Sequence, residues 1–398
     1  MKRIVLLIVT ITITAHTISQ SADTTRNSRF SLRADFEYFF KDNEFSAEKT
    51  SGYTIPGFYF RPRLVWNVEK HVRLEAGVHW LHYWGASSYP RNISFTAFPE
   101  MGEESAPSHV LPWMQARVDV LPQLSLVFGN LYNNDKHLQL PRPLYDDELL
   151  YATDPEAGIQ MLLNFKYFNA DIWADWRNFI FRGSETQERF ICGFSGRVKP
   201  IQTNVVNLSL PIHAIVQHTG GEMVAVSCAT ISMFNFSAGL QLGLRMGKVE
   251  VTTGCHAVAF INSGDTTLSF KNGWGIYPHF GAKFAGVSMD VAYWHGDNFV
   301  PLLGSPHFSN VSVKKTGLVF DPMDMLCASV GYELKKFRHT TLAVEGLTYI
   351  YFPYSGTFGD FTRIEKDGAA SFAFGFFLKV NPKIAPHGFY DRLRKKCK

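Results

Sequence analysis

The sequence predicts an all-β protein, a single transmembrane antiparallel up-and-down β-barrel of about 16 strands, with roughly 14 to 18 as the range. Three observations predict this fold class. Apolar and polar side chains alternate with a period of two along much of the chain, which is typical of strands with one apolar and one polar face. Short and long connections alternate between these segments, as in bacterial barrels with short periplasmic turns and long outer loops. No stretch of 18 consecutive apolar residues occurs, which excludes a bundle of transmembrane helices.

The first predicted strand illustrates the alternation. Phe30, Leu32 and Phe36 share one face, while Arg33 and Asp35 share the other. The same pattern places strands at 29–40, 57–68, 71–84, 108–120, 123–133, 157–166, 168–182, 187–198, 205–217, 232–245, 248–262, 275–284, 287–296, 324–335, 338–353 and 368–380. Short connections are expected at about 68–71, 120–123, 166–168, 198–205, 245–248, 284–287 and 335–338.

Aromatic side chains near strand ends are a weaker indication. Those that fit interfacial girdles are Phe39, Phe40, Trp84, Tyr132, Trp294, Tyr351 and Phe352. They are equally compatible with the core of a soluble extracellular multi-sheet protein, which is the alternative architecture. That alternative does not account for the rhythm of short and long connections.

The N-terminus has the features of a secretory signal peptide. Lys2 and Arg3 precede an apolar run that is too short to span a bilayer, and small and polar residues follow it. We expect 1–19 to be removed, with the cut uncertain by about 3 residues. The remaining chain divides into a transmembrane barrel over 20–380 and a basic periplasmic tail over 381–398. An even number of strands that begins in the periplasm also ends there, so we expect both termini to be periplasmic.

Charge and cysteine usage exclude several classes of function. The formal net charge is +4, and its excess lies in the signal peptide and the tail, so we expect no nucleic-acid partner. The five cysteines include no C-x-x-C pair and are odd in number, which signals neither a disulfide framework nor a zinc site. We interpret them as isolated thiols, and we expect no cofactor and no metal.

With these features in view, the chain resembles outer-membrane β-barrels of the Bacteroidota porin-like type, whose function is obscure. The resemblance spans 20–380 in architecture. Its more specific part is the segment 128–160, FGNLYNNDKHLQLPRPLYDDELLYATDPEAGIQ, which looks like a loop found in such barrels. The resemblance implies a location in the outer membrane of a Gram-negative cell, with outer-membrane lipid as a partner. One departure is that 18 residues follow Val380, whereas many barrels end on the aromatic residue of the last strand.

Ionisable side chains on the less apolar strand faces are expected to line the lumen. Basic and acidic groups balance there, which argues against a strongly anion- or cation-selective pore. The candidates for solute contact are Arg33, Asp35, Glu37, Arg61, Arg63, Arg73, Glu75, Arg117, Asp119, Asp171, Asp175 and Arg177. Two roles stay open for Arg61, Arg63 and Arg73 on neighbouring strands. They form either a basic ladder for anionic or sugar groups, or structural ion pairs with nearby carboxylates, which we favour.

The predicted loop at 134–156 carries six acidic side chains against two basic ones, and three prolines stiffen it. Three alternatives stay open for it. It folds into the lumen as a constriction, gathers carboxylates around a hard cation such as calcium, or remains a solvated outer loop. The last is favoured, because no EF-hand spacing is present. The constriction candidates are His137, Arg142, Asp146, Asp147 and Glu148.

The strand number favours an outer-membrane porin-like channel for the passive passage of small hydrophilic solutes, because about 16 strands leave room for water. One alternative is a plugged barrel that acts in adhesion, envelope assembly or secretion. A second is a barrel enzyme that acts on envelope lipid or glycan. No G-x-S-x-G, H-E-x-x-H or Walker motif occurs. We interpret the inward histidines at 79, 213, 256 and 279 as lumen hydrogen-bonding groups. We therefore expect a protein that is not an enzyme, either a monomer or a homo-oligomer such as a trimer.

Overall fold

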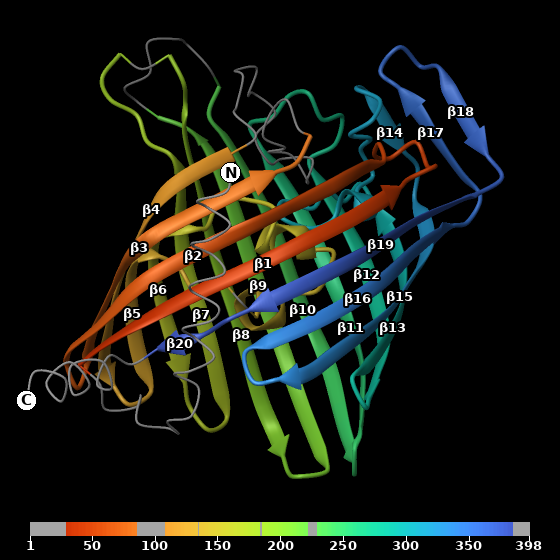
Figure 1. Cartoon of the computed structure of the whole chain (residues 1–398). Coiled ribbons are helices and arrows are strands. Elements are labelled where there is room, and N and C mark those ends of the chain that lie inside the picture. The colour runs from red at the N-terminus through yellow and green to blue at the C-terminus, as the bar shows by residue number, and fades with distance from the viewer. Residues whose placement is uncertain (1–28, 86–107, 134, 184, 222–228, 385–398) are drawn as a thin grey trace, which may run out of the picture.

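The wall of the protein is a closed antiparallel β-barrel (Figure 1). The computed structural model describes residues 29–85, 108–133, 135–183, 185–221 and 229–384. Each strand pairs with its neighbour in sequence, and pairing of the first strand with the last closes the wall. The 16 strands of the wall are β1 (Phe30–Glu44), β2 (Tyr53–Glu69), β3 (Val72–Tyr83), β4 (Ser108–Leu121), β5 (Leu124–Asn130), β6 (Ala157–Asn164), β7 (Phe168–Asn178), β8 (Glu188–Gln202), β9 (Val206–Gly220), β10 (Ile231–Met246), β11 (Val249–Ser263), β12 (Asn272–Phe284), β13 (Val287–Asp297), β15 (Met323–Phe337), β16 (Thr340–Tyr351) and β19 (Ala369–Val380). The predicted fold class and strand number are confirmed.

The two ends of the barrel differ in their connections. Hairpins β2/β3, β4/β5, β6/β7, β8/β9, β10/β11, β12/β13 and β15/β16 are joined by two or three residues at what we call the short-turn end. The remaining connections meet at the opposite, long-loop end. There β14 (Leu318–Phe320), β17 (Tyr354–Phe358) and β18 (Arg363–Lys366) form a separate small sheet, drawn in blue in Figure 1, which was not predicted.

The chain enters and leaves the wall at the short-turn end. β20 (Lys383–Ile384), at the start of the expected tail, pairs with β1 through Leu32 and Arg33. The expected signal peptide and the residues beyond 384 lie outside the described part of the chain, so the domain boundaries stay predictions. None of the described helices is long and apolar enough to cross a bilayer.

The outer face of the wall is apolar and exposed. On β9, for example, Ile212 is 49% exposed, whereas the next residue, His213, faces inward and is 2% exposed. This follows from the pleat, which sends successive side chains to opposite faces of the sheet. An outer face of exposed Phe, Leu, Ile and Val side chains is stable in lipid rather than in water. The soluble multi-sheet alternative is thereby excluded.

Two inward loops fill much of the lumen with a hydrophobic core. The loop at 131–156 contributes the buried side chains of Leu140, Leu144 and Tyr145, and the loop at 298–322 contributes those of Phe299, Leu302 and Phe308. They pack against inward-facing wall residues that include Ile215, Val258 and Met325. The favoured expectation of a solvated outer loop at 134–156 is therefore wrong. Burial of these apolar side chains provides the driving force for the inward position.

The filled lumen also corrects the prediction that the aromatic residues near strand ends form interfacial girdles. Phe39, Trp294 and Tyr351 face inward and belong to the buried core, because they meet the inward loops rather than lipid. Trp84 and Phe352 are exposed, as the girdle prediction requires. Among the described cysteines, those at 192, 255 and 327 are free thiols, as expected.

A left-handed turn begins the first inward loop. All four residues of the short helical segment α2 (Lys136–Gln139) have positive φ, between 48° and 64°. Each L-residue in this conformation costs roughly 1–2 kcal/mol. The contacts of His137 hold the turn in place.

Candidate active site

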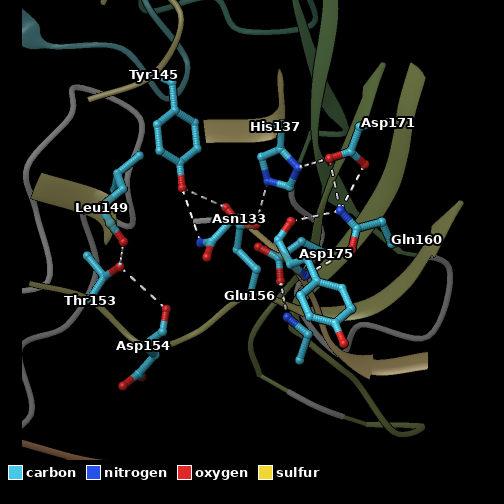
Figure 2. A network of polar contacts seen from close by, with 12 residues as sticks. Asn133, His137, Tyr145, Leu149, Thr153, Asp154, Glu156, Gln160, Asp171 and Asp175 are labelled. Atoms are coloured by element: carbon cyan, nitrogen blue, oxygen red, sulfur yellow. Dashed lines mark hydrogen bonds and ion pairs between the residues drawn. The ribbon is translucent and has the colours of Figure 1, made fainter. Parts of the chain in front are cut away.

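His137 lies at the centre of a buried polar network in the lumen (Figure 2). Its Nδ1 is 2.9 Å from Asp171 Oδ2, and its Nε2 is 2.7 Å from Glu156 Oε2. Burial alone lowers the pKa of His137, but the carboxylates of Glu156 and Asp171 outweigh burial and raise the pKa to about 10. The side chain is therefore an imidazolium that donates to a carboxylate on each side. Because both ring nitrogens are hydrogen-bonded to carboxylates, His137 holds the loop in place and is not available as a catalytic base.

The same network ties the end of the first inward loop to the wall. Tyr145 donates its hydroxyl to Glu156 across 3.1 Å, and Gln160 Nε2 donates to both carboxylate oxygens of Asp171 at 2.9 Å. Asp175 accepts a hydrogen bond from the backbone N–H of Ala157 at 2.9 Å and forms an ion pair with Arg177. Figure 2 shows Tyr145, Glu156, Gln160, Asp171 and Asp175 converging from the loop and the neighbouring strands. The predicted site residues Asp171, Asp175 and Arg177 thus anchor the loop.

The predicted arginine ladder lies near the short-turn end and is paired with carboxylates. Glu75 contacts Arg33 at 3.9 Å, Arg63 at 3.3 Å and also Arg73, and Arg63 pairs in addition with Asp35. The ion-pair interpretation of the ladder matches this geometry. Solute contact by these side chains stays a prediction.

The remaining predicted lumen residues are distributed over the same region of the wall. Arg61 donates to His79 Nδ1 at 3.2 Å and lies over the ring of Trp113, 4.2 Å from its centroid. Glu37 pairs with Lys379 at 3.0 Å, and Arg117 pairs with Asp119 at 2.8 Å. The structure therefore brings these residues together as local pairs on the inner face of the wall.

The acidic residues of the inward loop are neutralised by the wall and by the loop itself. Glu148 accepts from Lys41 at 2.7 Å, from the Tyr53 hydroxyl at 2.8 Å and from Asn43 at 3.1 Å. Asp146 caps η2 (Asp147–Leu150) by accepting from the N–H of Glu148. Another group is formed by Arg142, which donates to Ser329 at 3.1 Å and lies 3.5 Å from Asp147. Among the described residues, no group of three His, Cys, Asp or Glu is arranged to hold a metal.

Serine and histidine meet in two different environments. Inside the lumen, Ser195 Oγ lies 2.9 Å from His213 Nδ1, and Ser237 Oγ lies 3.3 Å from His256 Nδ1. All four side chains are buried on the inner face of the wall, away from lipid. The interpretation of these inward histidines as lumen hydrogen-bonding groups fits this geometry.

A third pair lies on the lipid-facing wall. His218 Nδ1 and Ser232 Oγ are 2.9 Å apart, and the two residues are direct cross-strand partners on β9 and β10. They share the outer face with Ile212 and Phe236, the latter 40% exposed, because all four are separated by even steps along continuous strands. Since β9 ends at Gly220 and β10 begins at Ile231, the pair lies at the long-loop end.

An aromatic row holds the His218 imidazole in position. Trp176, Phe190 and His218 are successive cross-strand partners on β7, β8 and β9, and Ser232 continues the row on β10. The ring centroids of Trp176 and Phe190 are 5.0 Å apart, and those of Phe190 and His218 are 4.9 Å apart, each pair with planes 28° apart. A Cβ placed on Gly220 would lie 3.1 Å from His218 Nε2, which is a tight approach. Stacking on Phe190 and the space left by Gly220 therefore restrict the position of the ring.

This arrangement provides a nucleophile and its base at the surface of the barrel. A serine hydroxyl hydrogen-bonded to an imidazole is the minimum required for nucleophilic attack on an ester. Sequence reasoning missed the pair because the two residues come from different strands and form no local motif. The available signal was His218 directly after the predicted strand 205–217 and Ser232 at the start of the predicted strand 232–245. Both residues continue the apolar faces of these strands, where a polar side chain is unexpected.

A closed antiparallel barrel with an apolar outer face and a polar pair at one rim belongs to the class of outer-membrane β-barrel proteins. Within this class, the chain belongs to the Lipid A 3'-O-deacylase-type family, whose model matches residues 22–387. This family is an enzyme family, so the expectation that the protein is not an enzyme is wrong. No curated protein matches the chain.

One solved structure supports the architecture, and two further ones are similar at a lower score. OccK8 (OprE) of Pseudomonas aeruginosa is 13% identical, with 89% of this chain and 98% of that chain covered and a TM-score of 0.50. The outer membrane protein OpdK of Pseudomonas aeruginosa is 10% identical, with 89% and 98% covered and a TM-score of 0.49. The outer membrane protein OmpT of Vibrio cholerae is 7% identical, with 89% and 97% covered and a TM-score of 0.48. At these identities the likeness to OccK8 shows the fold alone. The outer-membrane barrel is thus confirmed, and a Bacteroidota origin stays a prediction.

Proposed function

We propose that the protein is an ester hydrolase that removes an acyl chain from lipid A in the outer leaflet of the outer membrane. The observation that carries the proposal is the 2.9 Å hydrogen bond between Ser232 and His218 on the lipid-facing wall. Bacterial barrels keep their long loops on the extracellular side, so the long-loop end corresponds to the outer leaflet. The family name supplies the substrate class, an acyl ester at the 3'-oxygen of lipid A.

The proposed reaction needs only these two side chains and water. His218 accepts the hydroxyl proton of Ser232 as Oγ attacks the carbonyl carbon of the ester. The bond between that carbon and the sugar oxygen breaks, and the imidazolium returns its proton to the leaving sugar hydroxyl. Water, deprotonated by His218, then hydrolyses the acyl-serine, which releases a fatty acid and regenerates the serine. No outside oxidant or co-reactant is required.

The location of the pair suits this substrate. An acyl ester of a glycolipid lies at the boundary between the sugar and the hydrocarbon, and the pair lies where strands meet the long loops. On the same outer face, the exposed side chains of Phe236 and Leu240 provide an apolar surface for the acyl chain. The lumen pairs have the same chemistry, but they are buried where a bilayer lipid does not reach.

The test is hydrolysis of lipid A by refolded protein in mixed micelles, followed by mass spectrometry of the loss of one acyl chain. We expect Ser232→Ala and His218→Ala each to reduce the rate by about 100-fold or more, since both remove a reacting group. The matched control is Ser195→Ala, which removes the serine of a lumen pair with the same 2.9 Å geometry and is expected to leave the rate unchanged. Full activity of Ser232→Ala would overturn the assignment.

Passage of small hydrophilic solutes is the second candidate function. It is favoured by a cavity of about 530 Å³ between the first inward loop and the inner face of the wall, lined by His256, His279 and Lys283 among others. The hydrophobic core of the lumen opposes it, because passage requires displacement of the inward loops. The test is single-channel conductance of the intact protein and of a variant in which 134–156 is replaced by a short glycine-serine linker. Absence of conductance in the intact, folded protein would exclude passive passage of solutes.

A further inference from the structure

A second polar group interrupts the apolar outer face on the other side of β11 and β12. His295 on β13 and Asp324 on β15 are direct cross-strand partners, and His295 Nδ1 lies 2.8 Å from Asp324 Oδ1. The hydroxyl of Tyr293 donates to the same carboxylate oxygen. The ring of Trp274 on β12 lies 5.3 Å from the imidazole of His295, measured between centroids.

These four side chains point toward lipid at the long-loop end. The residues that follow Tyr293 and Asp324, Trp294 and Met325, face inward and are buried. Trp274 is 46% exposed, and Tyr293 is 37% exposed. β13 ends at Asp297 and β15 begins at Met323, so the group sits within a few residues of the rim. A position near the rim and the polar character of the group both favour the level of lipid head groups over that of acyl chains.

A carboxylate on a lipid-facing wall is costly unless it meets polar groups there. Tyr293 and His295 both bind Asp324 through Oδ1, and among the described residues Oδ2 and His295 Nε2 form no hydrogen bond. The group therefore offers an acceptor, a second imidazole nitrogen and a phenol next to an exposed indole face. The carboxylate repels phosphate, so it favours contact with the hydroxyl groups of a ligand rather than with its phosphate groups.

We propose that Trp274, Tyr293, His295 and Asp324 bind the sugar head group of an outer-leaflet glycolipid. A pyranose has one apolar face that stacks on an indole, and hydroxyl groups at its edge that donate to carboxylates and accept from imidazoles. An acyl chain alone makes no use of the carboxylate. In the described part of the chain, no cluster of ligands favours a metal at this place.

This inference rests on the proposed function for the identity of the lipid, but not for the binding itself. β10, which carries Ser232, and β13, which carries His295, are separated by two strands. The register runs from His295 through Ile276 and Ala257 to Ala238, which lies six residues from Ser232 along β10. With strands about 4.8 Å apart and about 3.3 Å per residue, the two groups are about 25 Å apart on the wall. The binding group and the proposed catalytic pair thus share one outer surface without being adjacent.

Binding is measured by native mass spectrometry of detergent-solubilised Ser232→Ala protein, which serves as the parent because it is expected not to consume the lipid. Lipid A is titrated against the parent and against versions that also carry Trp274→Ala or His295→Ala. We expect each added change to weaken binding by about tenfold. The matched control is Phe280→Ala, which removes an exposed apolar side chain on the same face of β12, six residues from Trp274, and is expected to leave binding within about twofold. Heat-modifiable electrophoretic migration establishes that each variant is folded.

A second titration uses a water-soluble glucosamine disaccharide without acyl chains. Loss of disaccharide binding in Trp274→Ala would support recognition of the sugar itself, and binding of the intact lipid without any binding of the disaccharide would overturn it. Unchanged lipid binding in both Trp274→Ala and His295→Ala overturns the inference. The hydrolysis experiment on Ser232→Ala measures loss of an acyl chain, whereas these titrations measure binding. Failure of the proposed function and failure of the proposed binding group would therefore give different results.

Discussion

The imidazole of His137 lies flat on the indole of Trp173, with ring centroids 3.7 Å apart and planes 8° apart. A histidine from a left-handed turn is therefore clamped between an aromatic face on β7 and two carboxylates. This contact joins the first inward loop to the wall, and Trp173 also belongs to the hydrophobic core that both inward loops form.

We expect His137→Gln to loosen the first inward loop. The change leaves Glu156 and Asp171 buried without the imidazolium between them, and breaking a buried ion pair in this way costs about 3–5 kcal/mol. The measurement is limited proteolysis within 134–156 together with urea unfolding in detergent. Gln139→Ala, an exposed position in the same turn, is the control and is expected to behave like the wild type. Equal protease resistance of both variants would contradict the role of His137.

The same histidine predicts a pH dependence of loop stability. Because its folded pKa is raised from 6.5 to about 10, its contribution is fully present below pH 6.5 and is lost as pH rises to about 10. Hydrogen exchange of the loop amides, corrected for the intrinsic effect of pH, is expected to show protection falling across this window. His137→Gln is expected to lose this dependence, and a variant that keeps it would assign the effect to another group.

Lys49 predicts the opposite pH dependence. Its ammonium group is buried, donates to the carbonyl of Ser309 and lies over the ring of Phe320, 5.1 Å from the centroid. Burial lowers its pKa from 10.5 to about 7, so the cost of the buried charge grows as pH falls from 10.5 to 7 and is constant below.

Lys49→Met is therefore expected to stabilise the protein, with the largest gain below pH 7 and none near pH 10.5. The measurement is the midpoint of urea unfolding in detergent at pH 6, 8 and 10. Lys314→Met, at a partly exposed position of the second inward loop, is the control and is expected to show no such trend. A gain that does not vary with pH would contradict the assignment.

A substitution at Gly220 tests how tightly His218, the proposed base, is held in position. A Cβ at this position would lie 2.9 Å from Thr230 Cγ2 and 3.1 Å from His218 Nε2, so we expect Gly220→Ala to shift both side chains by a few tenths of an ångström. We expect about a tenfold loss of kcat in lipid A hydrolysis with the barrel intact, because misplacement of a catalytic group weakens proton transfer. Gly243→Ala is the control, since its added Cβ would meet its nearest atoms at 3.7 and 3.8 Å. Equal rates for the two variants would argue against His218 as the base.

The sequence by itself determined the wall of the barrel. The alternation in the first strand, with Leu32 and Phe36 on one face and Arg33 and Asp35 on the other, is a local property of the pleat and needs no knowledge of distant residues. The short connections followed for the same reason, because two or three residues between alternating segments leave room only for a tight hairpin.

Only the tertiary structure decided what fills the lumen and where the candidate site lies. The acidic loop enters the barrel because partners such as Lys41 and Arg177, far away in sequence, compensate its charge, and sequence spacing does not encode that compensation. Phe39 and Trp294 face this core rather than lipid, since an aromatic side chain suits either environment. Ser232 meets His218 through a strand register set across a long loop, and a register shifted by one residue would have sent either side chain into the lumen.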